Sequence, residues 1–214
     1  MKIVFYGDSI TDMCRENKDL EKENSSIYSY GSGYVFYVAG DLKRENPSIS
    51  VINRGVSGNR IVDLYARVKG AVWNYTPDIL SILVGVNDIW HELAHKNGVD
   101  IKRFEKIYRM LIQDTLKELP NVKIVLVEPF ILKGSLTVGH WDEFLQVKEY
   151  AKVVKKLAKE FNLGFVPMQE KFDIASEKFG VEHYLYDGIH PNVAGARLIA
   201  DAWIEYYNQN FKNL

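Results

Sequence analysis

The sequence predicts an α/β protein in which five parallel strands form a sheet covered by helices on both faces. Short β-favouring runs alternate along the chain with longer segments whose apolar residues recur at helical spacing. The β-favouring runs are almost wholly apolar, which is typical of strands buried on both faces. Strand–helix alternation of this kind favours a parallel sheet joined by right-handed crossovers.

Each element follows from a local pattern. The predicted strands are Ile3–Tyr6, Ser50–Asn53, Ile79–Val84, Ile124–Glu128 and Gly164–Pro167. The clearest predicted helices are Tyr34–Glu45, Val62–Trp73, Phe104–Leu119 and Phe144–Phe161, with a last one after Pro191 that runs to about Tyr207. Proline suits the first position of that helix, where its missing N–H costs nothing.

Length and composition limit the classes of protein that the chain can represent. Its 214 residues fit a single domain spanning 1–214, and 47% hydrophobic against 26% charged residues is ordinary for a globular protein. Lys plus Arg (27) nearly balances Asp plus Glu (28), which argues against a nucleic-acid or membrane-surface partner. A single cysteine, Cys14, excludes an internal disulfide. With no signal-peptide pattern, the expected location is the cytoplasm.

Polar residues follow the first three predicted strands. Ser9 comes just after the first, Gly58 after the second and Asn87 after the third. In a doubly wound sheet of order 2-1-3-4-5, these three loops are neighbours at the carboxyl edge, where such folds bind ligands. Ser9 would then lie between glycine-rich backbone and a carboxamide.

The stretch "YDGIHPN" supplies two further groups, Asp187 and His190, three residues apart before the last helix. Acyl transfer by a serine needs a base, a group that orients the base, and donors for the oxyanion. Asp187 can orient the imidazole of His190 toward Ser9. The donors would be the backbone N–H groups of Ser9 and Gly58 and the side-chain amide of Asn87.

"GDSIT", the glycine of "VSGN", "GVND" and "DGIH" occur in that order between residues 7 and 190. Together they resemble the four motif blocks of the SGNH, or GDSL, hydrolase family. The resemblance implies a flavodoxin-like three-layer α/β/α fold and a serine ester hydrolase that needs no cofactor or metal. It also implies Ser9 as nucleophile, His190 as base, Asp187 as its orienting acid, and Gly58 and Asn87 as oxyanion donors.

Longer blocks such as "NRGVSGN" and "GVNDIW" are similar to the intracellular acetylxylan esterases of that family. The implied substrate is an acetylated sugar of the xylo-oligosaccharide type. Trp90, Tyr30 and Tyr186 are candidate sugar contacts, because aromatic faces cover sugar C–H surface; packing in the core or rim is the alternative for each. Asp8 either caps the following helix or binds substrate. The sequence leaves open a homo-oligomer and other acyl substrates, including short-chain esters, lysophospholipids and thioesters.

Two different classes of function compete with this interpretation. "HELAH", His91 to His95, has the spacing of a zinc-protease motif, but a third ligand is not indicated and a solvated helix face is the simpler interpretation. A non-catalytic sugar-binding protein could use the same edge of the sheet. It would have no need of an Asp–x–x–His pair, so the complete set favours an enzyme. Ser57 in "GVSGN" lacks the final glycine of the α/β-hydrolase motif and is interpreted as a turn residue.

Overall fold

The computed structural model describes residues 1–16 and 26–212. The strands are β1 (Lys2–Gly7), β2 (Ser50–Gly55), β3 (Ile79–Leu83), β4 (Lys123–Val127) and β5 (Gly164–Val166). The helices are α1 (Ser9–Asp12), α2 (Tyr34–Glu45), α3 (Ile61–Ala71), α4 (Val86–His95), α5 (Ile101–Glu118), α6 (Trp141–Phe144), α7 (Val147–Glu160), α8 (Gln169–Phe179), α9 (Val181–Tyr184) and α10 (Val193–Asn210). Short 3₁₀ turns occur at Ile27–Tyr30, Trp73–Tyr75 and Val138–His140.

The five strands form one parallel sheet of order β2-β1-β3-β4-β5. This confirms the predicted strand order and places β1 in the interior of the sheet. The register sets Gly7, the last residue of β1, opposite Gly55 of β2 and Leu83 of β3. The segments that follow these three residues therefore leave the sheet side by side, at its carboxyl edge.

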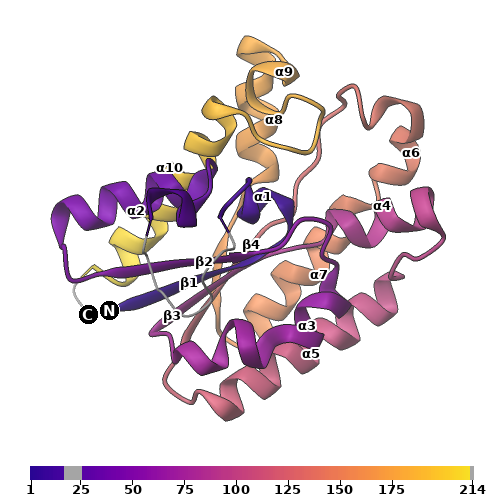
Figure 1. Cartoon of the computed structure of the whole chain (residues 1–214). Coiled ribbons are helices and arrows are strands. Elements are labelled where there is room, and N and C mark those ends of the chain that lie inside the picture. The colour runs from indigo at the N-terminus through magenta and orange to yellow at the C-terminus, as the bar shows by residue number, and fades with distance from the viewer. Residues whose placement is uncertain (17–25, 213–214) are drawn as a thin grey trace.

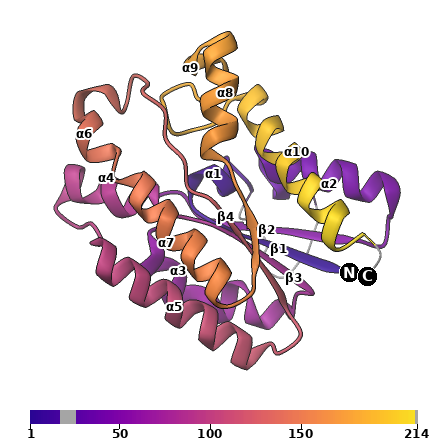
Figure 2. The ribbon, with the colours of Figure 1, turned by 180° about the vertical axis from the view of Figure 1, so that it is seen from behind.

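Helices cover both faces of the sheet, as the apolar strands predicted. Helices α2 and α10 pack together on one face, while α3, α5 and α7 cover the other (Figure 1); Figure 2 shows the same three layers from behind. Trp203 of α10 is fully buried, packs on Phe5 with ring centroids 4.9 Å apart and donates its indole N–H to Ser81 Oγ at 3.1 Å. One tryptophan thus joins the last helix to the two central strands.

The structure departs from the predicted helices in several places. The predicted helix Phe144–Phe161 corresponds to α7, which begins at Val147, and its first residue, Phe144, ends the separate short helix α6; ψ of Leu145 and Gln146 between them is −21°. The break between the two helices lets Phe144 face α4 while α7 packs on the sheet. Helices α6, α8 and α9 were not among the predicted elements, and α4 was expected only as the helix face at "HELAH". Each helix of the described residues is too short or too polar to span a membrane.

Candidate active site

The first turn after β1 places Ser9 at the carboxyl edge of the sheet, at the start of α1. Asp8 caps this one-turn helix by accepting the N–H of Ile10 on its Oδ1 at 3.0 Å. The backbone oxygen of Asp8 accepts the N–H groups of Thr11 and Asp12. Because these bonds fix the backbone on both sides of Ser9, the hydroxyl is presented from a rigid turn rather than from a mobile loop.

Ser9, His190 and Asp187 form a continuous chain of contacts. Ser9 Oγ lies 2.9 Å from His190 Nε2, although 181 residues separate them in the sequence. On the other side of the ring, His190 Nδ1 lies 2.7 Å from Asp187 Oδ2. Figure 1 shows how the fold achieves this, since the segment between α9 and α10 passes beside α1. The structure therefore brings together the three residues that the sequence analysis selected.

The pKa shifts of His190 and Asp187 suit a histidine that acts as a base. Burial lowers the pKa of His190, but the hydrogen bond and charge of Asp187 and the charge of Asp8 outweigh it, so the net shift is upward. Burial raises the pKa of Asp187, and the hydrogen bonds from His190 and Ile189 reverse this, leaving it below its ordinary value. The two shifts agree: Asp187 is ionised, and it stabilises the imidazolium form of His190.

The structure gives Asp8 the capping role, one of the two roles that the sequence allowed. Its side chain is only 1% exposed and serves as the helix cap. Burial raises its pKa to about 7, against the smaller opposing effects of the Ile10 N–H and of His190. A carboxyl that lies beneath the surface and is bonded to backbone favours the capping role of Asp8, and its contact with substrate stays a prediction.

Gly58 and Asn87, the predicted backbone and side-chain oxyanion donors, follow β2 and β3, the two strands on either side of β1. Gly58 has φ +81°, a conformation that favours glycine, and a Cβ added there would first meet Nε2 of His91, at 3.8 Å. Asn87 lies in the first turn of α4 and donates one amide N–H to the backbone oxygen of Asn59 at 3.1 Å. This bond ties the glycine loop to α4, and the amide has a second N–H to offer.

Two supporting contacts were missed by the sequence analysis. Asp12 Oδ2 accepts from the hydroxyl of Ser57 at 2.8 Å and from its N–H at 3.2 Å, which fixes the loop next to Gly58. The Asn53 amide donates to the backbone oxygens of Thr11, at 2.6 Å, and Tyr30, at 2.8 Å. Two features of the sequence could have indicated these contacts: the acid Asp12 follows Ser9 by three residues, and Asn53 is a lone asparagine in a buried strand. Ser57 is a turn residue, as predicted.

The segment that carries Asp187 is held by the loop after β4. Leu132 N–H donates to the oxygen of Gly188 at 2.9 Å, and Leu136 N–H donates to that of Asp187 at 3.0 Å. Gly134 packs so closely on this backbone that a side chain there would collide with Gly188. No sequence pattern linked residues 132–136 to the site, because the contact is between backbones far apart in the chain.

The three aromatic candidates for sugar contact have different surroundings. Tyr186 is 53% exposed and its ring stacks on that of His190. Trp90 is half-buried, packs against the core and contacts Phe144, with ring centroids 5.6 Å apart. Tyr30 is half-buried in the 3₁₀ turn, and burial raises its pKa. Of the three, Tyr186 directly contacts the Ser9–His190–Asp187 group.

The "HELAH" stretch forms the end of α4, with the rings of His91 and His95 edge to face at a centroid separation of 5.4 Å. Across residues 1–16 and 26–212, no three His, Cys, Asp or Glu side chains are grouped to hold a metal ion. The pKa of His91 is lowered by burial and by the nearby Arg60 and His95, which favours a neutral ring. His91 lies on the same helix face as Asn87, four residues apart, beside Gly58.

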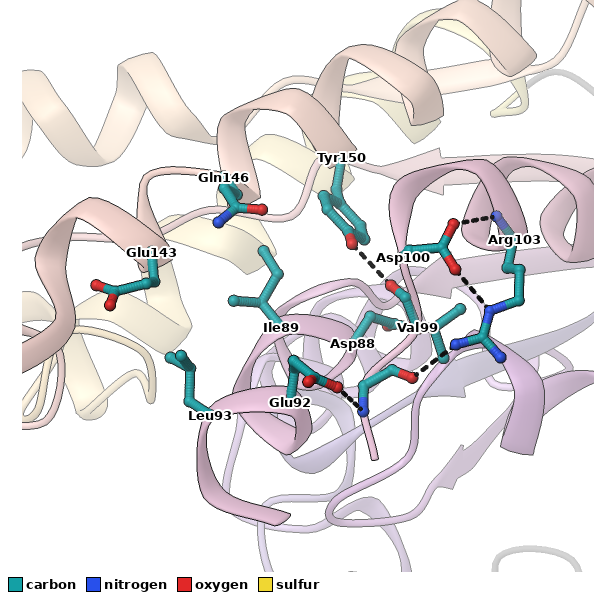
Figure 3. Close-up of a pocket in the computed structure, with 11 residues that line it drawn as sticks. Asp88, Ile89, Glu92, Leu93, Val99, Asp100, Arg103, Glu143, Gln146 and Tyr150 are labelled. Atoms are coloured by element: carbon teal, nitrogen blue, oxygen red, sulfur yellow. Dashed lines mark hydrogen bonds and ion pairs between the residues drawn. The ribbon is translucent and has the colours of Figure 1, made fainter. Parts of the chain in front are cut away.

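A separate pocket of about 470 Å³ lies on another face of α4 (Figure 3). Ile89 and Leu93 of α4 and Val99 give it apolar walls, while Glu92 and Glu143 stand at its margin. Ser9, His190 and Asp187 are not among its lining residues. The pocket is therefore distinct from the candidate active site.

A serine, a histidine and an aspartate in hydrogen-bond contact at the carboxyl edge of a parallel sheet are the arrangement of a serine hydrolase. Comparison with known proteins specifies the class further. Residues 5–198 match the model of the GDSL-like lipase/acylhydrolase family. The chain belongs to this family and is a carboxylic ester hydrolase.

Individual relatives agree with this assignment. Over 211 residues the chain is 35% identical to an acetylxylan esterase from Geobacillus stearothermophilus, covering 95% of this chain and 92% of the relative. A crystal structure of that bacterium's acetylxylan esterase has a TM-score of 0.83 at 33% identity, covering 96% of this chain and 93% of the other. A structure from Parabacteroides merdae, described as a GDSL-like lipase, has a TM-score of 0.89 at 37% identity, covering 97% and 95% of the two chains. The predicted three-layer α/β/α fold is thereby confirmed.

Proposed function

We propose that the protein, as one domain, is a serine esterase that removes acetyl groups from acetylated carbohydrates of the xylo-oligosaccharide type. The observation that carries the proposal is the pair of contacts of His190, 2.9 Å from Ser9 Oγ and 2.7 Å from Asp187 Oδ2. The similarity to an acetylxylan esterase over 95% of the chain supports the substrate class. Crystal structures of catalytic mutants of that relative have one serine, aspartate or histidine replaced by alanine.

In the first step, His190 Nε2 takes the proton of Ser9 as Oγ attacks the acyl carbon. The N–H groups of Ser9 and Gly58 and the amide of Asn87 stabilise the oxyanion. The imidazolium then gives its proton to the leaving sugar oxygen, and an acyl-serine remains. Water, deprotonated by His190, attacks this ester and releases acetate, which restores the Ser9 hydroxyl.

Substrate recognition requires surface beside the serine that suits a sugar. We assign this role to Tyr186, which is exposed next to His190, and to two half-buried residues, Trp90 and Tyr30. Trp90 follows Asn87 by three residues on α4, and the backbone oxygen of Tyr30 accepts from the same Asn53 amide as that of Thr11 in α1. Aromatic faces pack against sugar C–H groups, and tyrosine hydroxyls bind sugar oxygens. The reaction uses groups of this chain alone and calls for no cofactor.

The test is a panel of acyl esters from acetyl to long chain, assayed beside acetylated xylo-oligosaccharides. We expect acetate release from the sugars and a steep loss of rate as the acyl chain lengthens. Ser9→Ala should lower kcat by about 10⁴ or more. Ser48→Ala is the matched control, because Ser48 lies in the exposed turn before β2, where its N–H and its hydroxyl both donate to Asn46 Oδ1.

Three outcomes would contradict the proposal. A preference for long acyl chains or thioesters would indicate a different activity within the same family. Full activity in Ser9→Ala would exclude the serine mechanism. Binding of xylo-oligosaccharides with no turnover of any ester would instead support a sugar-binding protein.

A further inference from the structure

The ring of Tyr186 lies parallel to the imidazole of His190 and next to it. The two ring centroids are 5.8 Å apart and the planes differ by 18°. Backbone contacts hold this arrangement, since the N–H of Tyr186 donates to the backbone oxygen of His190 at 3.1 Å. The adjoining residues Leu185 and Pro191 form an antiparallel bridge. These contacts fix the backbone from which the Tyr186 ring, 53% exposed, extends beside the imidazole.

The imidazole has a different neighbour on each side. Asp187 contacts the Nδ1 edge and Ser9 contacts the Nε2 edge, while the buried carboxyl of Asp8 lies close enough to act on His190 through its charge. Tyr186 lies beside the imidazole in a nearly parallel plane, and burial and the charge of Asp187 raise the pKa of its phenol. The stacking of Tyr186 beside His190 is the contact to which the general base mechanism assigns no role.

We propose that Tyr186 stabilises the imidazolium form of His190 through its aromatic face, and so acts as a positioning residue for the base. A cation within about 6 Å of an aromatic centroid is attracted by the negative face of the ring. The attraction appears when His190 has taken the proton of Ser9 and vanishes when the proton leaves. It therefore favours the protonated states of the reaction over the resting state. The inference rests on the proposed role of His190 as base.

The test compares Tyr186→Phe, which keeps the aromatic face, with Tyr186→Leu, which keeps apolar cover over the imidazole but has no π system. The protonation of His190 is followed by NMR titration of the full-length protein, with the signal assigned from its loss in His190→Gln. We expect Tyr186→Phe to titrate as the wild type does and Tyr186→Leu to titrate about half a pH unit lower. On 4-nitrophenyl acetate, kcat/KM should be roughly threefold lower in Tyr186→Leu than in Tyr186→Phe.

Two results would overturn the inference. One is a His190 titration in Tyr186→Leu at or above the wild-type value. The other is an unchanged titration with a loss of rate only on acetylated xylo-oligosaccharides, which would make Tyr186 a sugar contact and nothing more. Should Tyr186→Leu fold poorly in a thermal melt, Tyr186→Met gives the same comparison. The titration needs no substrate, so a shift in Tyr186→Leu supports the ring contact even if no ester is hydrolysed and the proposed function fails.

Discussion

Asp187 holds His190 at two points. Its Oδ1 accepts the backbone N–H of His190 at 2.7 Å, while its Oδ2 lies 2.7 Å from the ring nitrogen Nδ1. A three-residue spacing allows this because the chain turns at Gly188, whose φ of +97° is strained for other residues. The acid therefore sets both the backbone and the ring of the base. Asp187 and His190 form one rigid unit that reaches Ser9.

Asp187→Asn should lower kcat by roughly 10² to 10⁴ while leaving the fold intact. The amide oxygen can still accept the backbone N–H of His190, but an amide N–H beside Nδ1 favours the ring tautomer that carries its proton on Nε2. That tautomer has no lone pair for the Ser9 proton. Removing the carboxylate also lowers the pKa of His190, so the acid limb of the kcat/KM profile should move to lower pH. An acid limb at the wild-type position would show that Asp187 does not set the base.

Asn87→Ala should reduce kcat by about 10² to 10³ with a much smaller effect on KM. An oxyanion donor acts on charge that develops only in the transition state, so its loss appears in kcat. The measurement is steady-state kinetics on 4-nitrophenyl acetate, with Asn121→Ala, on the exposed turn before β4, as the control. Wild-type turnover by Asn87→Ala would remove this residue from the oxyanion site. A rise in KM alone would make it a ground-state contact.

The sequence predicted the sheet well because its strands are apolar on both faces and its connections are helical. It missed α8 because only Phe172 of that helix is buried, so the helix shows no broad apolar stripe. It indicated a helix only for the "HELAH" end of α4, because the start of this helix follows β3 with only Val84 and Gly85 between them. The "GVND" and "HELAH" motifs lie on the same residues that form α4.

The site shows the same division between what local patterns reveal and what they do not. Ser9, Asp187 and His190 could be found from the sequence because each lies in a short motif beside a predicted element. Gly134 could not, since its importance arises from a backbone contact with Gly188 that only the tertiary structure creates. The sequence left Asp8 ambiguous because a polar residue next to the nucleophile is equally compatible with a cap and with a ligand contact. Its burial favours the cap.

Exhaustive treatment with a strong chelator should leave the esterase activity unchanged, and His95→Ala should do the same. His95 is exposed at the end of α4, and the two rings of the "HELAH" stretch contact each other rather than converge with an acid. The measurement is kcat/KM before and after dialysis against the chelator, followed by re-addition of zinc. Loss of activity that zinc restores would revive the metal-dependent interpretation of His91 and His95.

Asp8→Asn should flatten the pH dependence of stability between about pH 4 and pH 7. In the folded protein burial raises the pKa of Asp8 from 3.8 to about 7, so the folded state keeps a proton that the unfolded chain releases within this window. The free energy of unfolding of the wild type therefore falls as pH rises, by at most about 1.4 kcal/mol per pH unit from this group. Asparagine still caps α1 but cannot ionise.

The decisive quantity for Asp8 is the difference in unfolding free energy between Asp8→Asn and wild type, measured with guanidinium chloride at several pH values. A constant offset from the buried amide cancels when only the slope is compared, and the other carboxyls contribute equally to both proteins. The difference should grow in favour of the variant up to about pH 7 and then level off, because Asp8 is ionised in both states above its folded pKa. Parallel curves across this range would mean that Asp8 is already ionised in the folded protein at pH 4.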